Sequence, residues 1–581
     1  MNVRPNTGSS RAVSDRASTH ALLNCLIKEY ALPNGWIAYR WPADSRGLGE
    51  LRGQQGQPLD LHWPGEHGFD CCLLVDRRAY LGQHRYLSDP YVRLSGVHEW
   101  RACSFLQLAE VLIAAVAADD GEVNAELFEQ MRQSERGIAE MLAANAAVQD
   151  APRDYLASEQ RLWFGHPTHP APKARQWPDS MNSRRYSPEF QALTPLHQFS
   201  FPREGFECRT NGLATADVEA AVGRQGVEAD RVVLSMHPVQ AALFKQDPRA
   251  TRLLADGTCR DLGESGFSAA PTASLRTWYV KDHPYFIKGS LNVRITNCVR
   301  KNAWYEIESA LVIDRLFQRL KAQRDHTLAS MQLAREPASV HWAPLSGDDE
   351  ERRWFTEQTG IVLRENFCVD EGESRCLMAG GLFGRDVDLS PWVGRVIGDR
   401  DPVAWFEAYL EALVMPVLSL FFRHGVVLEP HLQNCVLIHD HGWPRAVLIR
   451  DFEGTKVTAE HGARWLEEGL APRVRESLIY PRAQGWCRVA YCLFVNHLAE
   501  AILALSWHRP ALGERLWLSV HAHLVSVRRR LGVSTPELDA VIAGGAIPCK
   551  TNLKVRLMGA SDRQSLYVQL PSPWRREVAC A

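Results

Sequence analysis

The order in which helix and strand patterns follow each other limits the folds open to this chain. Residues 105–147 contain two alanine-rich stretches in which apolar residues recur three or four positions apart, the spacing of one helix face. Between residues 231 and 295, short runs rich in Val, Ile, Tyr and Thr predict strands. From residue 403 to about residue 531 the pattern is again mostly helical. Helices and strands in separate regions predict an α+β fold class.

With 581 residues the chain is too long for one hydrophobic core, and we expect two to four domains. Two polar, proline-containing segments are plausible boundaries, residues 150–152 and residues 335–351. They divide the chain into residues 1–150, 151–345 and 346–581. Residues 1–20 are rich in Ser and Arg and lack a continuous apolar stretch, so we expect a loose, disordered terminus rather than a secretory leader.

Composition argues against several classes of function. The 66 Lys and Arg residues nearly cancel the 68 Asp and Glu residues, which leaves a net charge of −2 and no footprint for nucleic-acid or membrane-surface binding. The 14 cysteines show no zinc-ligand spacing, as expected for reduced thiols. The most apolar helical stretch, residues 403–422, contains Glu407, Glu411 and Pro416, which indicates a buried helix rather than a membrane span. We therefore expect a soluble, cytoplasmic protein.

A predicted hairpin carries the most informative polar residues. Its two strands are expected at residues 426–438 and 445–454. In an extended strand alternate side chains share a face, so Glu429, His431 and Gln433 are predicted to point the same way. A carboxylate, an imidazole and an amide on one face are an unusual choice inside an otherwise apolar run.

The returning strand of this hairpin brings two acids, Asp451 and Glu453, onto a common face. With the neighbouring Asn434 they form an oxygen-ligand set typical of Mg²⁺, which takes carboxylates, phosphates and waters. The alternative is a solvated hairpin edge. Apolar residues flank both strands and imply burial, and buried acids need partners, so the metal interpretation is favoured.

A second group of polar residues lies on a strand predicted from Lys288 to Thr296. Five polar side chains share one face of this strand: Lys288, Ser290, Asn292, Arg294 and Thr296. Ammonium and guanidinium groups bind phosphate and carboxylate, so this face suits a floor for such groups. An exposed sheet face is the alternative. Ser274 and Arg276 precede the strand, and Arg300 follows it.

A third group lies in a loop at residues 165–175, where three prolines exclude a helix or a central strand. His166, His169, Lys173 and Arg175 in this loop could clamp an anion. The His-x-x-His pattern is weak evidence for zinc without a third ligand, and a polar surface turn is the alternative. The sequence has no Walker-type loop, no Gly-x-Ser-x-Gly elbow and no dinucleotide fingerprint, so ATP would need a site other than a P-loop.

Taken in order, these segments resemble the IucA/IucC family, the siderophore synthetases that work independently of nonribosomal peptide synthetases. The resemblance covers about residues 156–556 and rests on eight motifs. They are Gly-His-Pro-x-His-Pro-x-x-Lys-x-Arg at 165–175, Tyr-Ser-Pro-Glu-Phe at 186–190, His-Pro-Val-Gln at 237–240, Ser274 with Arg276, Lys288 with Ile295, Thr296 and Arg300, Glu-x-His-x-Gln-Asn at 429–434, Arg-Asp-Phe-Glu-Gly at 450–454, and Lys550 with Arg556. Val239 departs from the family, which usually has an aromatic residue there, and the change affects packing alone.

The resemblance implies a thumb–fingers–palm architecture shaped like a cupped hand, with a palm distantly similar to that of a protein kinase. Residues 1–150 would be the thumb, 151–345 the fingers and 346–581 the palm, with ATP and Mg²⁺ between fingers and palm. It also implies two steps. A carboxylate, typically of citrate, attacks the α-phosphate to give an acyl adenylate and pyrophosphate, and an amine, or sometimes a hydroxyl, then displaces AMP. A homodimer is implied as well.

The resemblance also assigns roles to the residues found above. Four side chains would hold the triphosphate: His166, Ser274, Arg276 and Lys288. Arg300 would bridge the α-phosphate and the substrate carboxylate, and His431 would contact the substrate or the adenylate, so Arg300, His431 and Lys288 are the predicted catalytic residues. Two residues, Thr296 and Gln433, would line the nucleotide or substrate pocket. The predicted Mg²⁺ ligands are Glu429, Asn434 and Asp451, with Glu453 close by, and Asp451 would thereby also contact ATP.

Three other functions remain open at this stage. A catalytically inactive family member would release no pyrophosphate, and a kinase-like phosphotransferase would form ADP rather than AMP and pyrophosphate. A zinc hydrolase using His166 and His169 would contain bound metal. The acid is also open between citrate, a citryl monoamide and 2-oxoglutarate, and the amine is undefined.

Overall fold

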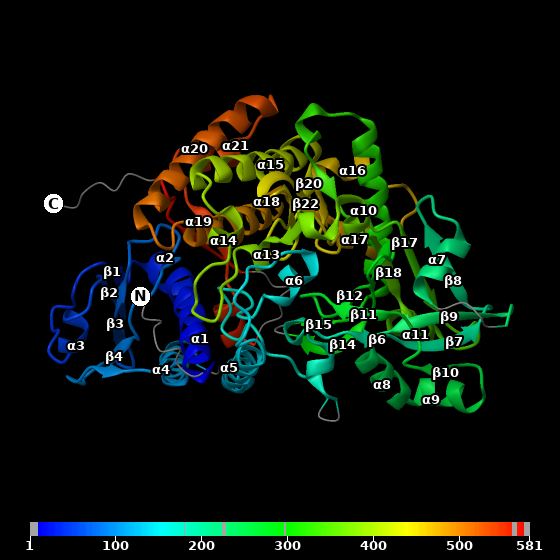
Figure 1. Ribbon diagram of the computed structural model, residues 1–581, viewed down its shortest axis with the longest axis horizontal. Helices are drawn as coiled ribbons and strands as arrows, with labels where there is room; N and C mark the ends of the chain where they lie inside the picture. Colours follow the sequence, from blue (N-terminus) through cyan, green and yellow to red (C-terminus); the bar gives the residue numbers. More distant parts are fainter. Residues whose placement is uncertain are drawn as a thin grey trace.

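The computed structural model describes residues 10–121, 123–178, 181–223, 228–295, 298–559 and 566–574. The molecule is elongated, with an N-terminal part at one end, a strand-rich part at the other and a mostly helical part beside both (Figure 1). The predicted mixture of helices and strands is confirmed, although the two kinds of element alternate along much of the chain. The 12 cysteines whose side chains the structure describes are free thiols, as predicted.

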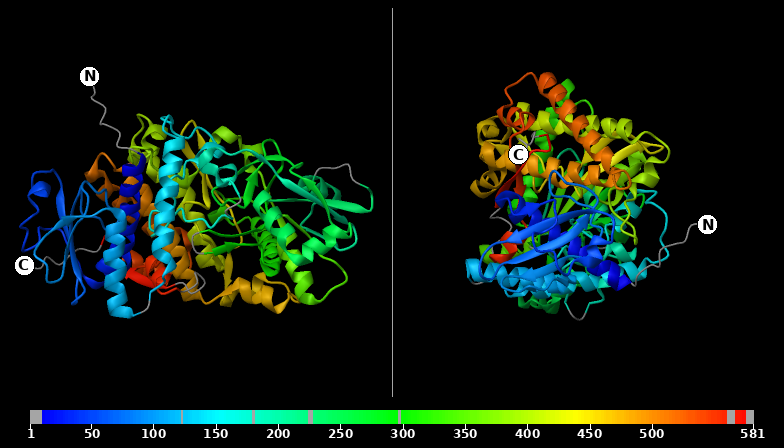
Figure 2. Two further views of the ribbon diagram at one scale, coloured as in Figure 1. Left: turned by 90° about the horizontal axis from the view of Figure 1, so that it is seen from below. Right: turned by 90° about the vertical axis from the view of Figure 1, so that its left-hand side faces the viewer.

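The N-terminal part is an antiparallel sheet covered by helices. Its five strands follow each other in chain order: β1 (Ile37–Ala38), β2 (Gln57–Trp63), β3 (Phe69–Val75), β4 (Tyr91–Leu94) and β5 (Arg101–Ala102). The two helices predicted within residues 105–147 are α4 (Phe105–Asp120) and α5 (Glu126–Ala144), and both are confirmed. The blue and light-blue helices of this part stand between its sheet and the rest of the molecule (Figure 2).

The loose terminus predicted for residues 1–20 is wrong from Ser10 onward, while residues 1–9 lie outside the described residues. Helix α1 spans Ser10–Leu26 and is largely buried. Tertiary contacts hold its polar residues: Ser14 Oγ donates to Glu135 on α5, and Asp15 Oδ1 accepts from the Phe105 N–H at 3.1 Å. A polar helix of this kind is stable because of its partners, which local sequence does not show.

The strand-rich part is built on a seven-stranded sheet. In spatial order its strands are β6 (Thr194–Pro195), β11 (Ser268–Pro271), β12 (Thr277–Tyr279), β13 (Tyr285–Lys288), β18 (Ile361–Glu365), β17 (Ala338–Trp342) and β8 (Phe206–Thr210). Strand β18 lies between β13 and β17, so the sheet crosses the boundary expected at residue 345. Three further strands pair beside it, β10 (Arg260–Gly263), β7 (His197–Pro202) and β9 (Arg231–Met236).

The single strand predicted from Lys288 to Thr296 is wrong. Strand β13 ends at Lys288, Gly289 and Ser290 interrupt it, and β14 (Leu291–Ile295) begins a separate two-stranded sheet with β15 (Cys298–Arg300). The Gly289 N–H donates to the Arg276 carbonyl, and Ser290 Oγ donates to the Glu357 carbonyl at 2.6 Å, so the chain turns away from the large sheet at this point. Thr296 lies outside the described residues.

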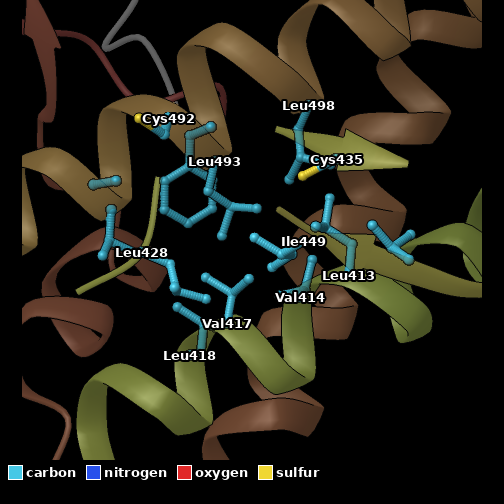
Figure 3. Close-up of a cluster of buried hydrophobic side chains, with 14 of the residues drawn as sticks. Leu413, Val414, Val417, Leu418, Leu428, Cys435, Ile449, Cys492, Leu493 and Leu498 are labelled. Atoms are coloured by element: carbon cyan, nitrogen blue, oxygen red, sulfur yellow. The ribbon is translucent and has the colours of Figure 1, made fainter. Parts of the chain in front are cut away.

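The C-terminal part packs helices around a short mixed sheet. Its four strands are β16 (Gln332–Leu333), β22 (Trp443–Ile449), β21 (Cys435–Asp440) and β19 (Cys376–Met378). Helix α15 (Pro402–His424) ends at Gly425 in the left-handed region, as predicted, with a φ of 67°. Figure 3 shows Leu413 and Val417 of α15 meeting Ile449 of β22 and Leu493 of the π-helix η7 (Tyr491–Leu498).

Two helical stretches in the described residues are long and apolar enough to cross a membrane by length and composition. They are Pro402–His424 and Arg482–Leu505, and 72% and 89% of their most apolar windows are buried inside the protein. The second stretch runs through α18 (Arg482–Ala490), η7 and α19 (Ala499–Leu505). Core helices of this length and apolarity pass the same test, so both stretches are explained by the packing around them.

The predicted hairpin exists, but both of its strands are shorter than predicted. The polar segment Glu429–Asn434 is a turn and not a strand, because the His431 N–H donates to the Glu429 carbonyl at 2.8 Å and the Asn434 N–H donates to the His431 carbonyl at 2.9 Å. Pro430 has no N–H for a sheet ladder, and a proline inside a strand is itself a signal against that assignment. The returning strand ends at Ile449, before both acids.

Candidate active site

Two buried cations lie where two neighbouring inner strands of the seven-stranded sheet meet their connecting segments. Lys288 is the last residue of β13, and Arg276 directly precedes β12, whose Thr277 pairs with Lys288. Their side chains are 3% and 4% exposed. Arg276 Nη1 donates to Asn302 Oδ1 at 2.7 Å. The sheet register therefore places two positive charges side by side and almost out of water.

Two acids from the segment after β22 meet these cations. Lys288 Nζ lies 2.7 Å from Asp451 Oδ1 and 3.5 Å from Glu453 Oε2, and Arg276 pairs with the same Glu453 oxygen. Burial raises the pKa of Asp451, but Lys288, Arg364 and Arg276 outweigh burial and hold that pKa well below its usual range. The acid is thus ionised at neutral pH, and the contact joins the strand-rich part to the C-terminal part.

The backbone of Asp451 is itself unusual, with a φ of 73° in the left-handed region. Aspartate adopts this conformation more readily than most residues other than glycine, yet it still costs energy. The conformation lets the chain leave β22 and direct the Asp451 carboxylate back toward Lys288. The two acids share these partners because of this local turn and not because of the strand alternation that was predicted.

A buried acid that the sequence interpretation missed lies behind Lys288. Glu336, fully buried, has Oε1 2.7 Å from Arg364 Nη2 and 3.7 Å from Lys288 Nζ. Arg364 Nη2 also lies 3.5 Å from Asp451 Oδ1, so two cations and two acids alternate in one cluster. Arg364 could have been found, because it is a cation that directly follows the apolar run Ile361–Leu363, whereas Glu336 stood in a segment interpreted as a boundary.

Ser274 lies in a tight turn two residues before Arg276. Its Oγ lies 3.1 Å from Thr272 Oγ1 and accepts from the Thr277 N–H at 3.2 Å, and Leu275 takes a φ of 67° to close the turn. These contacts fix the Ser274 hydroxyl group within the turn that precedes Arg276 and β12.

Arg450 and Glu159 form a buried pair that supports both halves of the site. Arg450 Nη1 pairs with Glu159 Oε1, while Glu159 Oε2 accepts from the Ala273 N–H at 2.8 Å in the turn before Arg276. Arg450 Nε and Nη2 donate to the Gln433 carbonyl at 3.0 and 2.8 Å. The guanidinium thereby ties the turn Glu429–Asn434 to the turn that carries Ser274.

Glu429 is held on the opposite side of this turn. Its Oε1 lies 2.9 Å from Arg488 Nη1, a cation on α18 that the sequence interpretation did not identify. Burial raises the pKa of Glu429, but Arg488, His431 and Lys550 together lower it below its usual value. Asn434 Nδ2 donates to the Glu429 carbonyl at 3.3 Å, so this amide supports the turn.

Two half-buried imidazoles face the same region. Burial lowers the pKa of His431 and lowers that of His166 well below its usual value, so both rings are neutral at physiological pH. His166 Nδ1 accepts from the Thr168 N–H at 3.0 Å, and Nε2 lies 2.7 Å from Asn496 Nδ2. Asn496 Oδ1 accepts from the Leu432 N–H at 3.1 Å, which connects the histidine loop to the turn that carries His431.

The anion clamp predicted for the loop at residues 165–175 is wrong for its two cations. Lys173 Nζ and Arg175 Nη2 lie 2.5 and 2.6 Å from Oε1 of Glu189, whose side chain is 1% exposed. Their charges are used inside the protein, because a buried carboxylate requires them. From this loop, His166 reaches the cluster around Asn496 and Leu432.

The remaining predicted residues lie apart from the cluster or beyond the description. Arg294 is 41% exposed and pairs with Glu126 at 3.0 Å, and Asn292 Nδ2 donates to Gln358 Oε1 at 2.6 Å. Neither shares a face with Lys288, because the strand breaks between them. Arg300 ends β15, and its side chain, like Thr296 as a whole, is outside the described residues.

The acids of the site fit a bound Mg²⁺ only in part. Asp451 and Glu453 converge on one ammonium group within 3.5 Å, a geometry that also suits a cation shared with phosphate oxygens. Glu429 is instead paired with Arg488, and Asn434 supports its own turn. No three His, Cys, Asp or Glu side chains in the described part of the chain are grouped to hold a metal ion by themselves. A Mg²⁺ ion here would depend on ligands from the nucleotide.

Two protein families match parts of the chain. The IucA / IucC family matches residues 154–384, and the ferric iron reductase FhuF-like transporter family matches residues 403–565. The rhizobactin siderophore biosynthesis protein RhbC of Rhizobium meliloti (strain 1021) is 30% identical over 95% of this chain and 96% of that protein. The L-2,3-diaminopropanoate–citrate ligase of Staphylococcus aureus (strain NCTC 8325 / PS 47) is 26% identical over 72% of this chain and 74% of that protein.

Among solved structures, ATP-bound aerobactin synthetase IucA from a hypervirulent pathotype of Klebsiella pneumoniae has the same fold. The TM-score is 0.80 at 22% identity, covering 96% of this chain and 99% of that chain.

Proposed function

The chain belongs to the IucA/IucC family of siderophore synthetases, and from this membership we propose that it joins a carboxylate of citrate, or of a citryl derivative, to an amine or hydroxyl with ATP as co-substrate. In the first step a carboxylate oxygen attacks the α-phosphorus of ATP, and pyrophosphate leaves. In the second step the nucleophile attacks the acyl carbon of the adenylate, AMP leaves with its phosphate oxygen, and the nucleophile loses a proton. The product is an amide or an ester.

The observation that carries this proposal is the paired charge of Arg276 and Lys288 with Asp451 and Glu453. Two nearly buried cations must be neutralised, and the acids of the opposite part neutralise them. The triphosphate of ATP carries the same negative charge and would be held by Arg276 and Lys288. Asp451 and Glu453 would then hold Mg²⁺, which would supply neutralisation of phosphate charge.

The remaining roles follow the same division. Ser274 and His166 bind phosphate oxygens with Arg276 and Lys288, and Gln433 and Thr296 line the nucleotide or substrate pocket. Arg300 bridges the α-phosphate and the substrate carboxylate. His431, neutral at physiological pH, contacts the substrate carboxylate or the adenylate. Asp451 and Glu453 would hold Mg²⁺ together with phosphate oxygens, while Glu429, paired with Arg488, and Asn434 support the turn beside them.

The family's hand architecture provides the frame for these roles. We assign residues 1–150 to the thumb, with ATP between fingers and a palm distantly similar to a kinase palm. The fingers sheet extends through β18 to Glu365, so the division between fingers and palm lies later than residue 345. The protein acts in the cytoplasm as a homodimer and binds neither nucleic acid nor membrane.

A ligation screen tests the function. Purified protein, ATP and Mg²⁺ are incubated with citrate, a citryl monoamide or 2-oxoglutarate against a panel of diamines, hydroxylated lysine derivatives and amino alcohols. We expect AMP and pyrophosphate in equal amounts and an amide or ester by mass spectrometry. Formation of ADP would identify a phosphotransferase, and no product with any acid would overturn the proposal.

A matched pair of lysine variants ties the activity to the site. Lys288→Met removes the buried cation, whereas Lys301→Met removes an exposed lysine, 45% exposed, that pairs with Glu357. Loss of one charge contact to a transferring phosphoryl group costs about 100- to 1000-fold in rate. We expect that loss for Lys288→Met, and near-normal pyrophosphate release for Lys301→Met.

A further inference from the structure

Two adjacent charged residues are buried in the N-terminal helix, far along the chain from the site described above. Helix α1 continues into a π-helical turn, η1 (Ile27–Ala31), that contains Lys28 and Glu29. Lys28 is 0% exposed and Glu29 is 2% exposed. Charged side chains are almost never buried to this degree without partners, and π-helical turns are often found at functional sites. The partners of this pair are therefore informative.

The Glu29 carboxylate holds the start of a C-terminal helix. Its Oε1 accepts from the N–H groups of Asn552 and Leu553 at 2.9 and 3.0 Å, and its Oε2 accepts from the Lys554 N–H at 2.8 Å. These are the first N–H groups of α22 (Leu553–Leu557) and its preceding residue, which have no partner within the helix. Burial raises the pKa of Glu29 to about 7, although the three N–H groups favour the carboxylate.

Lys28 holds the loop that carries His166. Its Nζ donates to Thr168 Oγ1 at 2.7 Å and lies 3.7 Å from Glu500 Oε1. Asn552 Nδ2 donates to the Thr168 carbonyl at 2.6 Å. Three segments distant in sequence are thus tied together in one buried junction, at residues 28–29, 168 and 552–554.

Each tied segment lies next to a residue of the site. Thr168 donates its N–H to His166 Nδ1, so a shift of Thr168 moves that ring. Asn552 is two residues beyond Lys550, the last residue of β25 (Ile547–Lys550). Lys550 is close enough for its charge to act on Glu429, His431 and His166. The junction therefore supports two residues that enter the site from different parts of the chain.

We propose that Lys28 and Glu29 are positioning residues of the ligase site, through which the N-terminal helix places His166 and Lys550 for the adenylation step. The inference rests on the proposed function. It gives the N-terminal part a task in the reaction. Stability alone does not explain a buried lysine, because a protein with an apolar residue of similar volume in its place is often equally or more stable.

The test compares variants at the junction with a control at the same interface. Glu29→Gln, Lys28→Met and Thr168→Val each remove one contact of the junction. Asn124→Ala is the control, because Asn124 Nδ2 donates to the Arg556 carbonyl at 3.1 Å and so joins the N-terminal part to the far end of α22. Thr168→Val nearly conserves shape and remains informative if the two charge variants fold poorly.

We expect each junction variant to lower kcat and kcat/KM for ATP- and acid-dependent pyrophosphate release by about 10- to 100-fold, the loss that follows a displacement of about 1 Å. The KM for the amine should be unchanged, and Asn124→Ala should retain wild-type kinetics. In Glu29→Gln, hydrogen exchange should accelerate at the amides of His166 and Thr168 and at those of residues 552–554. In Asn124→Ala it should accelerate at the amides of residues 556–557 alone. Equal losses in control and junction variants, or unchanged kinetics in all of them, would overturn the proposal.

The exchange measurement separates the two hypotheses. If the wild-type protein releases no pyrophosphate with any acid, the proposed function fails. Accelerated exchange at residues 552–554 alone in Glu29→Gln, with none at His166 and Thr168, would overturn the positioning role. This outcome counts against it whether or not the wild-type protein is active.

Discussion

The Glu429 carboxylate lies against the backbone of Gly454, so closely that a Cβ at position 454 would stand 1.9 Å from Glu429 Oε2. Arg488 holds the other carboxylate oxygen at 2.9 Å. Glycine at position 454 thus leaves the space that the Glu429 carboxylate occupies, while its backbone has an ordinary φ. The segment after β22 therefore lies close to the turn after β20 (Val426–Val427).

Gly454→Ala should reduce activity while leaving the fold intact. The added methyl group must displace the Glu429 carboxylate, which is the end of a flexible side chain, so the change in stability should be small. A shift of about 1 Å at a reacting site costs on the order of 100-fold in rate. The measurement is kcat/KM for pyrophosphate release together with the melting temperature. Gly462→Ala is the control, because the nearest atom to its Cβ would be Ile479 Cδ1 at 3.6 Å; an equal loss there would contradict the explanation.

Asp451→Asn should fold normally and lose at least about 100-fold in rate. Asparagine tolerates the left-handed backbone of residue 451, with its φ of 73°, so the turn survives. The amide lacks the charge that pairs with Lys288 at 2.7 Å. Circular dichroism and pyrophosphate release measure the two effects. Asp440→Asn serves as control, since Asp440 is 53% exposed and pairs with Arg375 at the far end of the hairpin. Near-normal turnover of Asp451→Asn would exclude its assigned role.

Glu336→Gln should destabilise the protein by about 3–5 kcal/mol, the usual effect of removing one partner from a buried ion pair. The substitution leaves Arg364 and Lys288, both 3% exposed, with Asp451 as their nearest remaining acid. Chemical denaturation measures the change. In the double variant Glu336→Gln with Arg364→Gln the cost should be smaller than the sum of the single costs, since both remove the same interaction. Additive costs would show that the pair is not coupled.

Acid stability should depend on Glu189. Burial raises its pKa, but Arg175 and Lys173 outweigh burial and lower the pKa from 4.5 to about 2. A carboxyl whose pKa is depressed by folding stabilises the protein above its unfolded pKa, and the stabilisation disappears as the pH falls from 4.5 to about 2. The full effect is about 3 kcal/mol.

The difference in unfolding free energy between wild type and Glu189→Gln should therefore shrink by about this amount between pH 6 and pH 2, roughly 3 kcal/mol. Denaturation at several pH values measures it. Glu219→Gln is the control, because Glu219 pairs with Arg203 at 2.8 Å at the surface, where such pairs contribute less than about 1 kcal/mol. If the difference in unfolding free energy stays constant across the pH range, Arg175 and Lys173 do not lower the pKa of Glu189.

Strong local patterns predicted much of the fold. The helices within residues 105–147 and the long helix α15 were predicted from apolar spacing, and β9 (Arg231–Met236) from its Val-rich run. The predictions failed where a local rule was extended too far. Strand alternation was applied across Gly289 and across Pro430, and both residues interrupt the ladder.

The chemistry of the site was predicted better than its geometry. Residue types and motif order indicated that Lys288, Arg276, Asp451 and Glu453 belong together, and the structure brings them together. Glu336, Arg488 and Asn496 were missed, because the local pattern around each carries no sign of its partner in another segment, which is Arg364, Glu429 and His166 respectively.

By itself the sequence determined the element types, the family and the residues that carry charge into the site, because these depend on composition, spacing and motif order. Only the tertiary structure decided which charges meet. Lys173 and Arg175 form ion pairs with Glu189. Gly454 leaves space for the Glu429 carboxylate. Lys28 and Glu29 connect the N-terminal helix to segments next to the site. Burial is the physical reason, since a charge removed from water must find a partner, and the partner available depends on packing between segments far apart in the chain.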